Sequence, residues 1–137
     1  MNESLVRNNL RTLDGKAAIW SDEHGLSWVS FEPGVEITGE DAARLLELAK
    51  ITATDEEYFR VIFDLRTSPV ITDEARKFAA SGGPGTYVSS FAILVSDLPM
   101  RLVGNFFIRF HKPKQPTQIF SDAAEAVRWS LAQYHKK

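Results

Sequence analysis

The stretch that most constrains the fold is Tyr58-Phe59-Arg60-Val61-Ile62-Phe63-Asp64-Leu65-Arg66. It is the densest run of β-branched and aromatic residues in the chain, and such runs favour strands. Successive side chains of a strand point to opposite faces, so Phe63 and Leu65 share one face while Ile62 and Asp64 share the other. We therefore predict a central strand here, with Phe63 and Leu65 in the core.

The segments around this strand alternate between strand and helix patterns. Gly25 lies in the turn of an expected antiparallel hairpin, and Thr38 with Asp41 three residues later resembles a capping box. The order ββαβαβαβα with right-handed crossovers predicts an α/β fold, whose mixed sheet of about five strands is largely parallel after the hairpin. The expected strands are 17–20, 26–31, 58–66, 87–95 and 117–120, and the expected helices are 39–51, 72–80, 98–110 and a last one that begins at residue 121 or 122.

Length and composition suit one domain of ordinary size. The chain has 137 residues, of which 44% are hydrophobic, and this is enough for a core without disulfides. We predict a single domain over residues 16–137, and residues 1–15 are either a leader or an edge strand. The absence of cysteine suits a cytoplasmic protein. Because no apolar run has membrane-spanning length and the net charge is −2, we expect no transmembrane segment and no nucleic-acid partner.

The third expected helix carries more apolar side chains than contact with one sheet face requires. Because these side chains surround most of the helix, some of them need another partner. A two-fold homodimer is the commonest solution, and we predict that it uses Phe107 and Ile108, with Arg101 and Arg109 at its rim. The segment 1–15 or a bound ligand would be alternative covers. The apolar residues of this helix are Met100, Leu102, Val103, Phe106, Phe107, Ile108 and Phe110.

Several short motifs accompany this order of elements. They are Asp-Leu-Arg at the end of the central strand, Gly-Asn-Phe-Phe at 104–107, Lys-Pro at 112–113, Pro-Thr at 116–117, and Ile-Phe-Ser-Asp at 119–122 followed by Ala-Val-Arg-Trp at 126–129. Together they resemble an uncharacterised bacterial group with the SpoIIAA-like (STAS-like) fold, over about residues 16–133. The better-known relatives are non-catalytic anti-sigma-factor antagonists and transporter-appended regulatory domains. The resemblance therefore implies a regulatory or protein-interaction domain with a possible protein partner.

The resemblance also places two residues at a regulatory position. In those relatives, the loop after the central strand carries an Asp-Ser pair, and a partner kinase phosphorylates the serine. Thr72 and Asp73 stand at these positions here, so the phospho-acceptor is missing. Asp73 is either an acidic mimic of the phosphorylated form or, as base rates favour, part of a helix cap. Phosphorylation of Thr72 itself stays open.

A second candidate site lies at the carboxyl end of the central strand. Asp64 and Arg66 share a face there, and an ion pair between them is the expected structural role. The functional alternative is a ligand crevice, in which Arg101 and Asn105 from the third helix join them. The three histidines have no carboxylate at ligand spacing, and no catalytic or phosphate-binding motif is complete. We therefore predict no metal, no cofactor and no catalytic residue.

Three classes of function remain open. A non-catalytic regulatory or protein-interaction domain is the first, on the resemblance. A binder of a lipid or other apolar small molecule is the second, because the apolar third helix stands beside Arg109, Lys112 and Lys114. An enzyme of unknown class is the third. A deep apolar cavity under the third helix favours the second class, whereas a flat self-complementary patch favours the first.

Overall fold

The structure, a computed structural model, describes residues 6–53, 59–81 and 87–133. In the described part of the chain, no helix has the length and apolar character needed to cross a membrane. The strands are β1 (Asn8–Leu13), β2 (Ala17–Ser21), β3 (Ser27–Phe31), β4 (Glu36–Ile37), β5 (Phe59–Asp64), β6 (Val70–Ile71), β7 (Val88–Leu94) and β8 (Thr117–Phe120). The helices are α1 (Gly39–Thr52), α2 (Asp73–Ala79), α4 (Leu98–Phe106), the π-helical turn η1 (Phe107–His111) and α5 (Ala123–Ala132).

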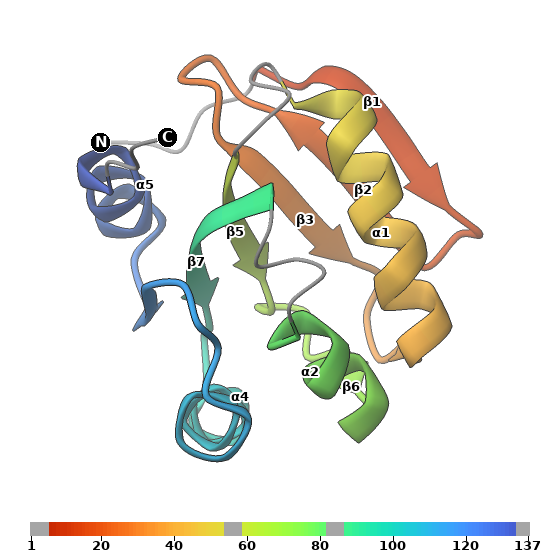
Figure 1. The fold of residues 1–137 in the computed structure, drawn as a ribbon, viewed down its shortest axis with the longest axis vertical. Coiled ribbons are helices and arrows are strands. Elements are labelled where there is room, and N and C mark those ends of the chain that lie inside the picture. The colour runs from red at the N-terminus through yellow and green to blue at the C-terminus, as the bar shows by residue number, and fades with distance from the viewer. Residues whose placement is uncertain (1–5, 54–58, 82–86, 134–137) are drawn as a thin grey trace.

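One mixed sheet organises the molecule, with the strand order β1-β2-β3-β5-β7-β8 (Figure 1). The first three strands are antiparallel, and β3, β5, β7 and β8 run parallel to one another. This arrangement confirms the predicted α/β class and the hairpin. The main sheet has six strands instead of about five, because residues 8–13 form the edge strand β1. Strands β4 and β6 form a separate parallel pair.

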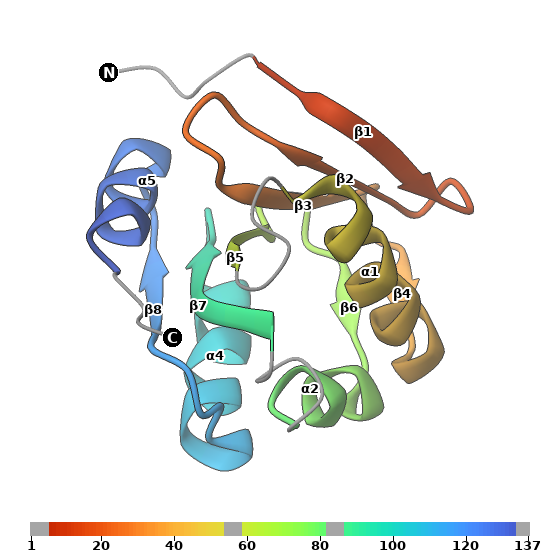
Figure 2. The ribbon, with the colours of Figure 1, turned by 45° about the horizontal axis from the view of Figure 1, so that its top comes forward.

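The sheet separates two layers of helices (Figures 1 and 2). The larger core lies between the sheet and α1, α2 and α4, and it holds side chains such as Ile19, Val61 and Phe91. The smaller core lies under α5, and it holds Ile62 and Leu94. Because neighbouring side chains of β5 enter different cores, this strand is buried on both faces, as expected of a central parallel strand.

Strand β5 confirms the central-strand prediction with one correction. The strand covers 59–64, and Tyr58 lies outside the described residues. Leu65 is buried as predicted, but Phe63 is only partly buried. Its ring packs beside that of Phe91, with centroids 5.2 Å apart, and also lines a cavity under the helices.

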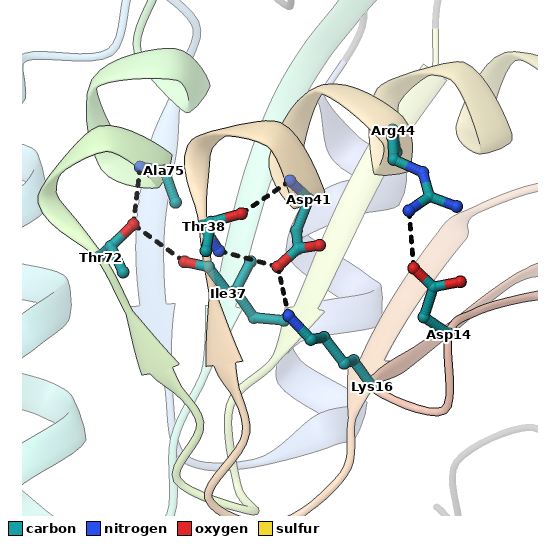
Figure 3. Close-up of polar contacts among 8 residues, drawn as sticks. All are labelled: Asp14, Lys16, Ile37, Thr38, Asp41, Arg44, Thr72 and Ala75. Carbon is teal, nitrogen blue, oxygen red and sulfur yellow. Dashed lines mark hydrogen bonds and ion pairs between the residues drawn. The ribbon is translucent and has the colours of Figure 1, made fainter.

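Polar side chains fix where α1 and α2 begin (Figure 3). The Thr38 hydroxyl accepts the Asp41 N–H at 3.1 Å, and an Asp41 carboxylate oxygen accepts the Thr38 N–H at 3.0 Å. This reciprocal pair confirms the predicted capping box. The Thr72 hydroxyl accepts the Ala75 N–H at 3.2 Å and donates to the Ile37 carbonyl at 2.9 Å. The second helix is therefore tied to β4 at the position where the first helix starts.

The third helix differs from the regular α-helix predicted over 98–110. It is α-helical only over Leu98–Phe106 and then widens into the π-helical turn Phe107–His111. The helix lies close to β8 at Gly104, where an added Cβ would stand 2.9 Å from Ile119 Cδ1. The turn ends at Lys112, which has a positive φ of 49°. The change from an α-helix to a π-helical turn is set by tertiary packing, and the periodicity of the sequence does not predict it.

Asp41 makes the stability of the fold depend on pH. Burial alone would raise the pKa of this carboxyl, but hydrogen bonds from Lys16 and Thr38 outweigh burial and hold the pKa below its ordinary value. The Lys16 Nζ atom lies 2.8 Å from the carboxylate, which is only 9% exposed. A depressed folded-state pKa means that this stabilisation is complete above the unfolded-state pKa of about 4 and is lost as the pH falls through the folded-state value.

We expect Asp41→Asn to lower the free energy of unfolding by about 1 kcal/mol at pH 7, because the amide keeps an acceptor but loses the ion pair. The difference from the unaltered protein should shrink below about pH 4. Urea titrations from pH 7 to pH 2.5 measure both values. Asp14→Asn, which breaks the exposed pair with Arg44, is the control and should change little. A difference that stays constant down to pH 2.5 contradicts this account.

Candidate functional site

An apolar cavity lies between the sheet and the helices α1, α2 and α4. Its volume is about 120 Å³, whereas a single water molecule needs only about 10–15 Å³. The space can therefore hold an alkyl chain or a ring, and apolar cavities of this order bind such groups. The sheet contributes residues such as Phe59, Phe63 and Phe91, α1 contributes Ala42, Leu45, Leu46 and Ala49, α2 contributes Ala75, Arg76, Phe78 and Ala79, and the third helix contributes Val103, Gly104 and Phe107.

A polar cluster joins α2 to η1 beside this cavity. His111 Nε2 lies 3.1 Å from Asp73 Oδ1, and Lys77 Nζ lies 3.0 Å from Asp73 Oδ2. The hydrogen bonds from Lys77 and His111 hold the pKa of Asp73 below its ordinary value. The Arg76 guanidinium lies over the Phe106 ring, 5.4 Å from its centroid. These contacts fasten the start of α2 to the end of the third helix, and both elements line the cavity.

Thr72 and Asp73 occupy structural positions at the start of α2. The Thr72 hydroxyl both caps the helix and binds the Ile37 carbonyl, so both of its hydrogen-bonding roles are used. Asp73 is the first residue of α2, and its carboxylate faces Lys77 and His111. These contacts support the helix-cap interpretation that base rates favoured. Whether either residue takes part in regulation stays a prediction.

Asp64 and Arg66 form the expected ion pair at the end of β5. Arg66 Nε and Nη2 donate to the two Asp64 carboxylate oxygens at 2.9 and 2.8 Å. Within the described residues, the side chains of Arg101 and Asn105 form no hydrogen bond or ion pair with Asp64. The structure therefore joins two of the four residues of the predicted crevice. The crevice itself stays a prediction.

The third helix presents different residues to solvent from those predicted for self-association. Phe107 is buried and lines the cavity, and Ile108 is partly buried against the same core. A contact with a second copy cannot use Phe107 in this conformation, because its own chain covers it. The exposed apolar residues recur at every fourth position, and we call them the α4 stripe: Leu98, Leu102, Phe106 and Phe110.

Sequence reasoning missed Arg76 and the pairing of His111 with Asp73. Those two residues stand 38 positions apart in the chain, so no spacing rule for helices or strands connects them. Arg76 carries an i,i+3 relation to Asp73, which would ordinarily indicate an exposed surface pair. The useful signal was the apolar excess of the third helix, which indicated a ligand as one possible cover.

Comparison with known proteins places this fold. Among solved structures, the chain is similar to an uncharacterized protein of the DUF3478 family with a SpoIIAA-like fold from Shewanella loihica PV-4. The two share 14% identity with a TM-score of 0.52, over 94% of this chain and 98% of that one. This similarity confirms the SpoIIAA-like fold that the sequence motifs indicated. Among curated proteins, the comparison finds no match.

The family itself follows from a match along most of the sequence. The model of the family described as "Domain of unknown function (DUF7793)" matches residues 19–135, from β2 to beyond the end of α5. The match includes every element that lines the cavity and the cluster between α2 and η1. The chain belongs to the DUF7793 family, a domain of unknown function.

Proposed function

We propose that this domain is a non-catalytic binder of an apolar small molecule or lipid chain. The observation that carries the proposal is the apolar cavity of about 120 Å³ beneath α1, α2 and α4. Closely packed cores rarely leave voids larger than a water molecule. Concave, mostly apolar spaces of this kind are where small molecules bind in proteins. An apolar cavity under the third helix is the feature that, from the sequence, favours this class of function, and it supports the proposal.

The lining supports binding more than catalysis. Among the described residues, it is formed by aliphatic and aromatic side chains, with Arg76 as the one charged member. Binding pockets for small molecules combine an apolar lining with few polar groups. Acid–base catalysis, by contrast, needs a positioned proton donor or acceptor with a suitable pKa. A guanidinium stays protonated, so it is suited to holding a ligand and poorly suited to transferring a proton.

Native mass spectrometry of protein purified from its own host tests this function. We expect a species heavier than the chain, whose extra mass is released on denaturation. Ala42→Leu adds bulk to a residue that lines the cavity and should lose that mass. Ala43→Leu adds the same bulk in a separate groove beside α1 and should keep it. Both variants make the same change in the same helix. If the purified protein carries no ligand and binds neither 1-decanol nor decanoate, the proposal is wrong.

Self-association is a second candidate, and the α4 stripe is the observation that favours it. Its four side chains are 41–69% exposed, and the rings of Phe106 and Phe110 stack with centroids 4.3 Å apart. Exposed apolar rows of this kind commonly lie in contacts between chains. A two-fold contact between two such rows would bury the stripe of each copy. We therefore move the predicted contact from Phe107 and Ile108 to this stripe.

We expect a dimer in analytical ultracentrifugation at micromolar concentration, and Leu102→Gln with Phe110→Gln should weaken it at least tenfold. Residues 98–120 contain four Lys or Arg residues and no acidic residue. A two-fold contact brings these charges together, so added salt should strengthen the dimer by screening them. Leu131→Gln on α5, which is 41% exposed, is the control. A monomer that persists at high micromolar concentration rules out the dimer.

Two further expectations remain part of this proposal. A regulatory role with a protein partner rests on the family resemblance, and the α4 stripe offers exposed apolar surface for such a partner. A cytoplasmic location rests on the absence of cysteine. Pull-down with the stripe variants and fractionation of the host cell would test them separately.

A further inference from the structure

The part of the cavity lining that the structure describes contains one charged group, and its hydrogen bonding is incomplete. This group belongs to Arg76, whose side chain is 20% exposed. The Nε atom is fully enclosed, and it finds no hydrogen-bond partner among the described residues. Buried donors in folded proteins nearly always have an acceptor, so an exception calls for an explanation.

The other contacts of Arg76 hold the guanidinium in place. Its Nη1 donates to the Ile71 carbonyl, and its Nη2 lies 3.7 Å from Asp73 Oδ1. Asp73 cannot readily turn to the remaining Nε–H, because Lys77 and His111 already hold its two oxygens. The group is therefore fixed at the edge of an apolar space, and of its five N–H donors only one makes a hydrogen bond to a described residue.

We propose that the ligand of this cavity is an anionic amphiphile, whose carboxylate pairs with the Arg76 guanidinium while its alkyl chain fills the cavity. This inference rests on the proposed function and specifies the ligand class. A carboxylate supplies a charged acceptor to a guanidinium that makes one hydrogen bond to a described residue, and a charge-assisted hydrogen bond of this kind is stronger than a neutral one. The low dielectric of the apolar surroundings strengthens it further. An uncharged hydrocarbon would offer the guanidinium no acceptor.

A competing position for the charged head is the groove beside α1. That groove shares Leu46 and Phe78 with the cavity lining and carries Lys50. Lys50 already has partners, however, because its Nζ lies 3.1 Å from Glu47 and 4.1 Å from the centre of the Tyr87 ring. Arg76, by contrast, has a donor without an acceptor among the described residues, so Lys50 is a suitable control.

Isothermal titration calorimetry with decanoate and 1-decanol, each below its micelle concentration, tests the inference. These probes share a chain length and differ in the head group. The unaltered protein should bind decanoate at least tenfold more tightly than 1-decanol. Arg76→Gln should lose at least tenfold in affinity for decanoate and stay within threefold for 1-decanol. Lys50→Gln should keep the preference for decanoate.

A second measurement uses the unaltered protein, so it does not require that any variant folds. In ¹⁵N-resolved NMR of the unaltered protein, the Arg76 Nε–H signal should shift with decanoate and stay near its free position with 1-decanol. Equal affinity for the two probes, or an unchanged Nε–H signal with decanoate bound, overturns this inference but leaves the proposed function standing. If Lys50→Gln loses the preference for decanoate, the head group binds in the groove instead, and this inference is also overturned. Binding of neither probe by protein that also carries no ligand from its host removes both proposals.

Discussion

Phe91→Ala should lower the free energy of unfolding by about 3–5 kcal/mol, the range for truncating a buried phenylalanine. Phe91 is 2% exposed and lies on β7, next to the central strand. Its ring stands 5.2 Å from that of Phe63 and 6.3 Å from that of Phe107, so it connects the sheet to the third helix. Removal of the ring would also enlarge the cavity beside it, and the added void contributes to the loss.

Denaturant titration measures the loss in Phe91→Ala, and two other phenylalanines serve as comparisons. Phe63→Ala should cost less than Phe91→Ala, because Phe63 is only partly buried and already borders empty space. Phe110→Ala should cost well under 1 kcal/mol, because this ring is 69% exposed. If Phe91→Ala costs no more than Phe110→Ala, the packing of the larger core is wrong as described.

The elements that could be predicted from sequence are those fixed by neighbours in the chain. The capping box uses Thr38 and Asp41, three residues apart, and a single helical turn brings the two together. Strand β5 is a dense run of β-branched and aromatic residues, so its place in the sheet follows from its own residues. The parallel order of β3, β5, β7 and β8 follows from the helices between them.

The candidate site was harder to predict, because it depends on how well distant side chains fill space. The sequence showed that the third helix has more apolar side chains than contact with one sheet face can bury. A ligand was therefore one possible partner for the remaining side chains. The sequence could not show that Phe107 turns inward while Phe106 and Phe110 turn outward. The three residues point in two directions around the helix in any case, about 100° apart. Which direction faces the sheet is set by the packing of a helix that carries apolar residues on most sides.

The polar cluster at the cavity was unpredictable for a different reason. Asp73 and His111 lie on separate elements, and their contact exists only after α2 and η1 have docked. Arginine usually lies on the exposed face of a helix, so nothing in the sequence indicates that Arg76 lines a cavity. Its position there follows from the same docking. Aligning Asp73 with a regulatory serine drew attention to the correct segment, but the resemblance gave no indication of the histidine.

Asp22→Ala should lower the free energy of unfolding by about 2–5 kcal/mol, because it leaves buried donors without an acceptor. Asp22 is 2% exposed, in the turn between β2 and β3. One carboxylate oxygen accepts the backbone N–H groups of His24 at 2.8 Å and Leu26 at 3.0 Å. The other accepts the indole N–H of Trp28 at 2.9 Å. Each enclosed donor that loses its partner costs about 1–3 kcal/mol, and at least two of the three are enclosed.

A double-mutant cycle with Trp28→Phe separates the indole bond from the turn. In the Trp28→Phe background no indole donor remains, so Asp22→Ala should cost about 1–2 kcal/mol less than in the unaltered protein. Asp22→Asn should cost less than Asp22→Ala, because its amide keeps one oxygen acceptor while its nitrogen cannot accept. Urea unfolding followed by circular dichroism reports all four corners of the cycle without depending on Trp28 fluorescence. Equal costs of Asp22→Ala in the two backgrounds would show that the indole bond contributes nothing, and the expected loss would then fall to that of the turn alone.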